Sequence, residues 1–562
     1  MIHRNRVAFF RNVALLALCI LTSAALDGSA QVTRAVPGDP IKIESGLVSG
    51  TIGAPGVKMY LGVPFAAPPV RENRWRAPQP PAHWDGVLTA NRKPAECVQR
   101  LRNADTNQYY GEELSGEDCL YVNIWEPATA KKTSRLPVVV YIYGGAFFVG
   151  SASMPLYGGE TIAKKGVIYV AANYRVGVFG FMAHPEATAE SGHGASGNWG
   201  LLDQIAALKW VRENIGAFGG DPNNVTLVGQ SAGAMSISCL QASPLAHGLF
   251  QRIIAMSGAE VGGSIQPESS LAKAEQEGVK LQTAMKATSL RELRNLSGDK
   301  IFAMAQTARV AVGPLIDGYV LPKSMDSTFA MGEQNDVPVV TGSTANDIGT
   351  EIPLRKAKTV QEYQQLVKQA FGSDAETILQ IFPAHTDAEA TAEANLIAEN
   401  SGFAVGARSY AAAQAKAGKQ PAYLYLFTHV QPFAPGVKFS DLDPATAGAY
   451  HTSDVPYWLG TYESFNLLRH TRDWTARDKQ LSNDMQDVIV SFAKTGNPST
   501  SAAHFIRYDP LNEMRTRFGE TIQTERINSK AADLIKAHVT SVPRPASPAA
   551  PVADPGRARP VD

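Results

Sequence analysis

Short apolar runs alternate with helix-like stretches through most of the chain. Six runs have the length and apolar content of buried strands, and they lie at residues 136–143, 167–174, 224–230, 252–258, 337–343 and 422–427. Residues 201–215, between the second and third runs, carry apolar side chains at helical spacing. Apolar strands that are separated by helices are typical of parallel sheets. The pattern therefore predicts the α/β class, with an open, mostly parallel sheet and helices on both faces.

The segments outside this alternation have other patterns. Short β-like runs from about Ile41, including residues 57–63, predict a small antiparallel hairpin layer. The Pro-rich stretch at 64–81 predicts extended surface chain. Regions 265–335 and 351–420 are helix-rich, and we expect them to lie over the sheet and to help build a substrate cavity.

The two ends of the chain differ from its middle. Residues 1–30 hold three arginines, an apolar run at 13–26 and small residues at 28–30, which is the order of a secretory signal peptide. The apolar run is shorter than the ~20 residues that span a bilayer. We therefore expect cleavage near residue 30 and a soluble protein that is secreted or periplasmic. Residues 541–562 contain six prolines and have the composition of a disordered tail.

Composition narrows the function classes. The chain has 562 residues, of which 44% are hydrophobic and 19% charged, so it is an ordinary globular protein with room for several domains. Lys+Arg and Asp+Glu are both 52, and without residues 1–30 the counts are 49 and 51. A neutral chain lacks the positive charge by which proteins bind nucleic acids, so we expect no nucleic-acid partner.

The cysteines indicate one disulfide. Cys19 falls within the expected signal peptide, which leaves Cys97, Cys119 and Cys239. In an oxidising compartment we expect Cys97 to pair with Cys119, because they are 22 positions apart in a loop-like region. Cys239 lies in an expected helix, where a small buried apolar side chain is the simplest interpretation.

The strongest motif is Gly229-Gln-Ser231-Ala-Gly233, which follows an apolar strand and begins a helix. This is the context of the nucleophile elbow, in which a tight turn lifts the serine hydroxyl clear of the sheet. Glycine is needed on both sides of the serine because side chains there would collide with neighbouring backbone. We therefore predict that Ser231 is a nucleophile.

A serine hydrolase also needs donors where negative charge develops on the substrate carbonyl. The run Tyr143–Phe148 follows an apolar strand and contains small residues that let backbone N–H groups approach a substrate. We expect the N–H groups of Gly145, Ala146 and Ala232 to form this oxyanion hole.

With these strings in place, the chain resembles the type-B carboxylesterases, the family of para-nitrobenzyl esterases, animal carboxylesterases and cholinesterases. The resemblance runs from about Ile41 to about Phe518. It is carried by the segments GVPFAAPP (62–69), EDCLYVNIW (117–125), YGGAFFVGS (143–151), NYRVGVFGF (173–181), GNWGLLDQ (197–204), FGGDPNNVTLVGQSAGA (218–234) and HTSDVPYWLG (451–460). It implies a single α/β-hydrolase domain, which we place at residues 31–540, and no metal or organic cofactor.

The resemblance also implies the rest of a catalytic triad in the chain order Ser, acid, His. From the residues alone, His429 and His451 are both candidate bases. The family's His-x-x-Glu/Asp-hydrophobic-Pro-aromatic pattern matches His451 and not His429. Alignment on Gly342 places Asp347 where the family has a glutamate, and Glu351 is the alternative acid.

Two departures from the family bear on specificity. Gln230 stands before the nucleophile where many relatives have Glu, so the site lacks a negative charge that would favour cationic alcohols. Ala146 stands where many relatives have a third glycine, and its methyl group occupies space beside bulky alcohols. We expect neutral esters to be substrates and tertiary esters to be poor ones.

Several further residues take roles from the resemblance. Four aromatic residues in motif segments are candidates to line an apolar substrate pocket, with core packing as the alternative for each: Phe147, Phe148, Trp199 and Trp458. Ser257 resembles a polar residue that packs beneath the catalytic site. Cys97 and Cys119 coincide with the family's loop disulfide.

The sequence therefore predicts an exported serine carboxylesterase that hydrolyses neutral carboxylic esters, as small-molecule substrates, through a Ser-His-Asp triad and an acyl-enzyme, with no stable membrane insertion. Two alternatives remain open at this point. One is a non-catalytic binding or adhesion protein of the same fold, and the other is a hydrolase that prefers amides, thioesters or lipids.

Overall fold

The computed structural model describes residues 34–53, 56–111, 114–259, 261, 269–348 and 353–541. The expected signal peptide lies outside the described residues, as does the expected tail from residue 542. Among the helices that are described, none combines the length and the apolar character needed to cross a membrane.

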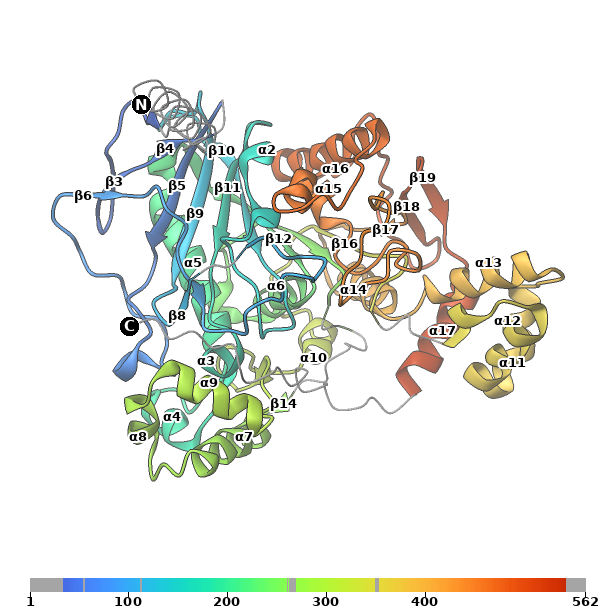
Figure 1. Ribbon diagram of the computed structural model, residues 1–562, viewed down its shortest axis with the longest axis horizontal. Helices are drawn as coiled ribbons and strands as arrows, with labels where there is room; N and C mark the ends of the chain where they lie inside the picture. The colour runs from blue at the N-terminus through green and yellow to red at the C-terminus, as the bar shows by residue number, and fades with distance from the viewer. Residues whose placement is uncertain are drawn as a thin grey trace, which may run out of the picture.

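A twelve-stranded sheet forms the centre of the molecule (Figure 1). In spatial order its strands are β1 (Arg34–Ala35), β4 (Thr51–Ile52), β5 (Val57–Pro64), β9 (Tyr121–Pro127), β11 (Ile168–Ala172), β10 (Leu136–Ile142), β12 (Gly220–Gln230), β13 (Arg252–Met256), β16 (Val339–Thr344), β17 (Ala422–Phe427), β18 (Met514–Phe518) and β19 (Ile522–Arg526). Neighbours from β11 to β18 are parallel, and the outer pairs are antiparallel. The six predicted apolar runs are β10, β11, β12, β13, β16 and β17, which confirms the predicted α/β sheet.

The N-terminal layer differs from the prediction. The small sheet consists of β2 (Ile41–Ile43), β3 (Gly46–Ser49) and β6 (Val87–Thr89). Residues 57–63 were wrongly assigned to it, because β5 pairs with β9 in the large sheet. The Pro-rich stretch is also not entirely surface chain, since Trp75 is fully buried. Two further two-stranded sheets join β7 (Glu96–Cys97) to β8 (Ser115–Gly116) and β14 (Ser269–Ser270) to β15 (Leu315–Ile316).

Helices flank the sheet. The α-helices are α2 (Glu160–Ala163), α3 (Gly177–Phe181), α4 (Pro185–Glu190), α5 (Trp199–Asn214), α6 (Ala232–Ala242), α7 (Leu271–Ala284), α8 (Leu290–Asn295), α9 (Gly298–Thr307), α10 (Met325–Ala330), α11 (Val360–Phe371), α12 (Ala375–Ile381), α13 (Asp387–Ala398), α14 (Phe403–Ala417), α15 (Val455–Leu459), α16 (Ala476–Thr495) and α17 (Ser529–Ser541). Short 3-10 helices lie at Arg71–Asn73, Pro155–Tyr157, Ile215–Phe218, Pro244–Ala246, Pro353–Lys356, Gly372–Asp374 and Tyr462–Asn466. α5, α6 and α16 pack against β12, and α14 packs against β16 and β17. The predicted helix at 201–215 is α5.

The two helix-rich regions form most of two lobes beside the sheet (Figure 1). The first contains α4, α7, α8 and α9, and its buried side chains pack on Trp75 and Trp199. The second contains α11, α12, α13 and α17 and has its own core, which includes Tyr363, Val367 and Ile535. These lobes are helical, as the sequence predicts, and α14 continues from the second lobe back to the sheet.

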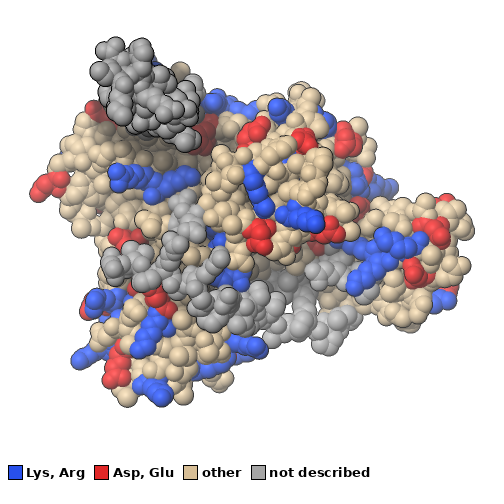
Figure 2. Space-filling model, in the orientation of Figure 1, with Lys and Arg blue, Asp and Glu red and all other residues tan. Residues whose placement is uncertain are grey.

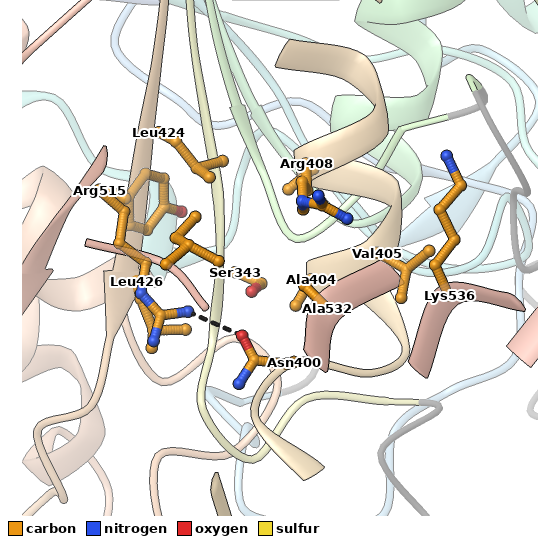
Figure 3. Close-up of a pocket in the computed structure, with 13 residues that line it drawn as sticks. Ser343, Asn400, Ala404, Val405, Arg408, Leu424, Leu426, Arg515, Ala532 and Lys536 are labelled. Atoms are coloured by element: carbon orange, nitrogen blue, oxygen red, sulfur yellow. Dashed lines mark hydrogen bonds between the residues drawn. The ribbon is translucent and has the colours of Figure 1, made fainter. Parts of the chain in front are cut away.

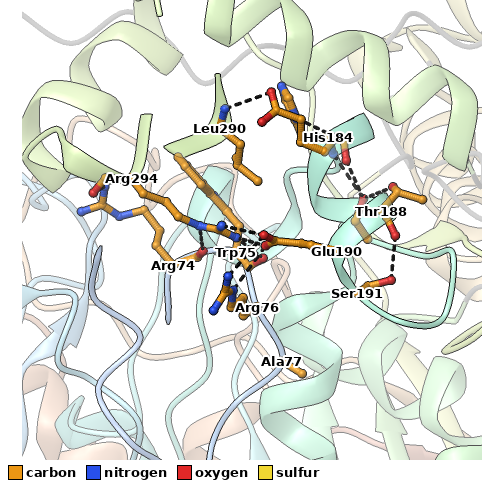
Figure 4. Close-up of polar contacts among 12 residues, drawn as sticks. Arg74, Trp75, Arg76, Ala77, His184, Thr188, Glu190, Ser191, Leu290 and Arg294 are labelled. Atoms are coloured by element: carbon orange, nitrogen blue, oxygen red, sulfur yellow. Dashed lines mark hydrogen bonds and ion pairs between the residues drawn. The ribbon is translucent and has the colours of Figure 1, made fainter. Parts of the chain in front are cut away.

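Ion pairs tie the first lobe to the rest of the molecule (Figure 4). Glu190 at the end of α4 receives hydrogen bonds from Arg294 of α8 and from Arg76. Arg294 also donates to the backbone carbonyl of Arg74 at 2.9 Å. The Arg74 side chain in turn pairs with Glu117. On the face drawn in Figure 2, basic and acidic side chains are interspersed.

The expected disulfide is present. Cys97 in β7 is bonded to Cys119, which lies just before β9. Cys239 is buried in α6.

Candidate active site

A sharp turn between β12 and α6 presents the Ser231 hydroxyl. Ser231 has φ 57° and ψ −128°, a conformation that non-glycine residues rarely adopt. Gly233 tolerates no side chain, because a Cβ there would lie 2.0 Å from the carbonyl oxygen of Ile142. A Cβ on Gly229 would lie 2.8 Å from the backbone of Gly233. This is the strand–turn–helix geometry of a nucleophile elbow.

Three side chains from distant parts of the chain form a continuous hydrogen-bonded row. The Ser231 Oγ lies 2.9 Å from the Nε2 of His451. The Nδ1 of the same imidazole lies 2.5 Å from the Oδ1 of Asp347. Asp347 follows β16 closely, and the loop that holds His451 is joined to it through a β-bridge between Asn346 and Tyr450. The row has the order and contacts that let a base take a proton from a hydroxyl while a carboxylate orients the base.

Asp347 is held as a carboxylate. Burial alone raises its pKa, but the charge of His451 and hydrogen bonds from His451, Ser257 and the Thr344 N–H outweigh burial and lower the pKa below its usual value. Asp347 also accepts the N–H of Ile348 at 2.8 Å. Ser257 is fully buried beneath this site and has a φ of 48°. With Nδ1 facing this carboxylate, Nε2 is the ring nitrogen that faces Ser231.

The loop after β10 passes beside the nucleophile. A Cβ on Gly144 would lie 2.9 Å from the Ser231 Cβ. Gly145 and Ala146 have φ of 124° and 54°, and Ala146 is exposed. Ala232 is the first residue of α6, where N–H groups have no acceptor within the helix. The predicted oxyanion donors thus flank Ser231 from two sides.

Comparison with known proteins identifies the family of this chain. The profile of the Carboxylesterase family matches residues 38–535. The chain belongs to this family. It is similar to the fumonisin B1 esterase of Sphingopyxis macrogoltabida (36% identical, covering 85% of this chain and 86% of the relative). It is also similar to the para-nitrobenzyl esterase of Bacillus subtilis strain 168 (34% identical, 83% and 92%).

Solved structures give the same result. A structure titled PNB esterase matches with a TM-score of 0.71 and 31% identity, over 88% of this chain and 99% of that one. A thermophilic PNB esterase matches with the same TM-score and 32% identity. The protein is therefore a carboxylic ester hydrolase with the α/β-hydrolase fold.

Two further side chains of this carboxylesterase contact the imidazole of His451. The Nε2 of Gln230, which is buried, lies 3.1 Å from the His451 Nε2. The ring of Phe403 stacks on the imidazole, with centroids 5.2 Å apart and an angle of 12° between planes. The sequence motifs indicate Gln230, but they do not indicate Phe403. Phe403 begins α14, and only the packing of that helix against β16 and β17 brings it to His451.

The candidate pocket aromatics divide into two groups. Three of them are buried in the interior, where packing accounts for them. Phe147 packs on Phe181, Trp199 donates to the Met182 carbonyl, and Trp458 packs on Tyr425 and Phe518. Phe148 differs from these three in being only half-buried.

The other candidate base has different partners. The Nε2 of His429 lies 2.8 Å from the Oδ1 of Asp478, and its Nδ1 lies 2.9 Å from Glu520. It is thus paired with carboxylates through both ring nitrogens, whereas the contact with Ser231 is made by His451.

A second buried carboxyl group lies near the row. Asp454 accepts hydrogen bonds from the Tyr425 hydroxyl at 2.9 Å and the Trp458 indole at 3.3 Å. Burial raises its pKa to about 6, against the lowering effect of the Tyr425 hydrogen bond and with help from the charge of Asp347. Asp454 therefore binds a proton at a higher pH than Asp347 does.

A small cavity between α14, α17 and the sheet lies apart from these groups (Figure 3). Its lining does not include Ser231, Asp347 or His451. Its arginines already have carboxylate partners, since Arg408 pairs with Glu513 and Arg515 with Glu525. Over the described part of the chain, no three His, Cys, Asp or Glu side chains converge as a metal ion requires.

Proposed function

We propose that this carboxylesterase hydrolyses its esters by two-step acyl transfer at Ser231. The observation that supports this most directly is the row from Ser231 through His451 to Asp347, with contacts of 2.9 and 2.5 Å. His451 takes the hydroxyl proton as Ser231 attacks the carbonyl carbon, and then gives it to the departing alcohol. Water, deprotonated by the same imidazole, hydrolyses the acyl-enzyme. Glu351, the alternative acid, lies outside the described residues.

The oxyanion of each tetrahedral intermediate is assigned to the N–H groups of Gly145, Ala146 and Ala232. The first two stand on the loop beside Ser231, and the third begins α6, where the helix dipole adds to the positive potential. Loss of one such donor typically lowers the rate about 100–1000-fold.

We infer that the substrates are small neutral esters. The side chain that touches His451 from the neighbouring position is the neutral Gln230, so no carboxylate stands there to pair with a cationic alcohol. The two relatives are named for different esters, those of fumonisin B1 and those of para-nitrobenzyl alcohol. Pocket shape, and not the catalytic row, must then select the natural ester.

We also propose that the enzyme is exported by a cleaved signal peptide at residues 1–30. The Cys97–Cys119 disulfide favours an oxidising compartment such as the periplasm or the medium. The catalytic domain would then occupy residues 31–540, and 541–562 would be a tail.

The test is hydrolysis of p-nitrophenyl esters with acyl chains from C2 to C16 by wild type, Ser231→Ala and the control Ser491→Ala. Ser491 lies on α16 and bonds the backbone of Asn497. We expect Ser231→Ala to lose about 10⁴-fold or more in kcat and the control to keep wild-type activity. Undiminished hydrolysis by Ser231→Ala would refute the mechanism.

The same panel separates the alternatives. No activity in any of the proteins, on any ester, would favour a binding role. A p-nitroanilide, a thioester and tributyrin, assayed beside the esters, would reveal a preference for amides, thioesters or lipids.

A further inference from the structure

The loop that carries two of the oxyanion donors is held by buried contacts at both of its ends. At its start, the Tyr174 hydroxyl donates to the Tyr143 carbonyl at 2.9 Å, and the two rings stack. At its end, the Gly150 N–H donates to the Oε1 of Gln99 at 2.7 Å, and the Nε2 of Gln99 donates to the Gly150 carbonyl at 2.8 Å. One carboxamide therefore holds both polar groups of one glycine.

The two-point contact fixes the orientation of Gln99. Only the carbonyl end of the amide can accept the Gly150 N–H, and only the NH₂ end can donate to the Gly150 carbonyl. The second hydrogen of the NH₂ group goes to the Cys97 carbonyl at 3.0 Å. Gln99 is 5% exposed, so little water reaches it to replace these bonds. A buried donor or acceptor that loses its partner costs about 1–3 kcal/mol.

The loop closes on itself, so its end affects its middle. A Cβ on Gly150 would lie 2.4 Å from the Gly144 carbonyl oxygen, which means that the two ends of the loop touch. The N–H groups of Phe148 and Val149 both donate to the Gly145 carbonyl, at 2.9 and 3.1 Å. A displacement of Gly150 is therefore passed to the peptide groups around Gly145 within a few bonds.

We propose that Gln99 is a positioning residue of the oxyanion hole, which acts through the Gly150 backbone to hold the N–H groups of Gly145 and Ala146 on the developing oxyanion. The proposal rests on the proposed function of this loop. Such donors must stand about 2.7–3.1 Å from the oxyanion, which forms only as the reaction proceeds. A loosened loop thus weakens transition-state binding more than substrate binding.

Gln99 also connects this loop to the disulfide. It follows Cys97 by two residues and bonds the Cys97 backbone, while Cys97 is tied to Cys119 before β9. The carboxamide is therefore anchored to a cross-linked segment, not to a free loop.

The decisive variant is Gln99→Met, which keeps the length of the side chain and removes its hydrogen bonds. Its matched control is Gln251→Met, because the Oε1 of Gln251 accepts the Val225 N–H at 2.7 Å in the middle of β12. For each we would measure kcat and KM with p-nitrophenyl butyrate, the Ki of a trifluoromethyl ketone that forms a tetrahedral adduct, and Tm.

We expect Gln99→Met to lower kcat about 10–100-fold, less than or near the cost of losing one donor outright, with KM within about twofold. The Ki of the ketone should rise by the factor by which kcat/KM falls. The midpoint of the acid limb of the pH profile should not move, because His451 keeps its contacts. Wild-type kcat and Ki, with only Tm lowered, would show a merely structural role and overturn the proposal.

Gln99→Glu keeps the proposal testable if the Met variant does not fold. An ionised carboxylate accepts the Gly150 N–H but repels the Gly150 carbonyl, whereas the protonated acid can make both bonds to Gly150 and loses only the bond to the Cys97 carbonyl. Its activity relative to wild type should therefore rise as the pH falls. A ratio that is constant with pH would overturn the proposal. The proposed role of Ser231, His451 and Asp347 is tested separately, because it would be refuted by activity that survives in Ser231→Ala.

Discussion

We expect the methyl group of Ala146 to occupy space beside the alcohol of a bound ester. The residue is exposed beside Ser231 and has a φ of 54°, which glycine adopts more readily. We predict that wild type hydrolyses tert-butyl acetate poorly and that Ala146→Gly improves this about 10-fold or more, the usual effect of one carbon in a close-fitting site.

Gas chromatography of the released alcohol measures the effect of Ala146→Gly. Ethyl acetate is the control, and its turnover should change little. Brisk hydrolysis of the tert-butyl ester by wild type would contradict the prediction.

Gln230 places a neutral amide beside His451, and the variant Gln230→Glu replaces this amide with a carboxylate. In Gln230→Glu a carboxylate would stand about where the amide now lies, 3.1 Å from the His451 Nε2. An adjacent negative charge stabilises the protonated imidazolium relative to the neutral ring. Because the base must be neutral, the acid limb of kcat/KM should move to higher pH.

A pH profile from about 5 to 9 with p-nitrophenyl butyrate records the limb, a range that contains the ordinary His pKa of about 6.5. Gln361→Glu on the exposed face of α11 makes the same change of charge far from the site and should leave the profile in place. Superimposable profiles for wild type and Gln230→Glu would mean that this side chain does not influence the base.

At this scale the sequence predicts residues that belong to motifs and misses those that tertiary packing brings together. Ser231 and His451 are indicated by local strings, and the structure places them 2.9 Å apart. Phe403 and Gln99 lie far from these strings in the chain, so no local pattern could relate them to the site. Trp458 shows a different limit of the motifs. It lies in a motif segment and was a candidate pocket residue, but its side chain is buried in the core.

At the scale of elements, continuous apolar runs identify the inner strands because both of their faces are buried. β5 was misassigned because a short run gives no information on its partner, which here is β9. The alternation of strand and helix predicts a parallel core but not the order of its strands, since β11 lies between β9 and β10. The lobes depend on contacts between side chains that the pattern does not contain.

The ion pairs of Glu190 offer a test of how the first lobe is attached (Figure 4). Burial would raise the pKa of Glu190, but hydrogen bonds and charges from Arg294 and Arg76 lower it to about 2. A lowered pKa in the folded state stabilises the fold at pH above the ordinary value of 4.5, and this contribution is lost as the pH falls toward 2. Glu190→Gln should therefore lower Tm at pH 7 by about 1–2 °C, since the pair is partly exposed.

Thermal unfolding of wild type and Glu190→Gln at pH 7 and pH 3 tests the sign. The difference in Tm should be smaller at pH 3. Glu463→Gln, an exposed glutamate, is the control and should shift Tm at neither pH. An equal difference in Tm at pH 7 and pH 3 would mean that the charge of Glu190 does not contribute to the stability of the lobe.

At the scale of the whole molecule, the parallel sheet explains why residues so far apart meet. Ser231, Asp347 and the loop that carries His451 follow β12, β16 and β17 in turn, and the carboxyl ends of parallel strands share one edge. Length alone allowed several domains, but one sheet of twelve strands runs from Arg34 to Arg526. Ser231, Asp347 and His451 therefore come together only when β12, β16 and β17 pair in the sheet.

The C-terminal end of the chain should divide sharply into a part that the fold needs and a part that it does not. α17 (Ser529–Ser541) completes the core of the second lobe, where Ile535 is fully buried among residues of α11 and α12. A buried Ile side chain contributes about 1.5–3 kcal/mol. Removal of residues 542–562 should leave kcat and Tm unchanged, because the family match ends at residue 535 and the contacts that join Ser231, His451 and Asp347 are made by residues before α17. Removal from residue 529 onward should expose the lobe core and lower Tm by several degrees or cause aggregation. Activity and thermal unfolding of the two truncations decide between these outcomes, and an equal loss of Tm in both would assign a structural role to the residues beyond α17.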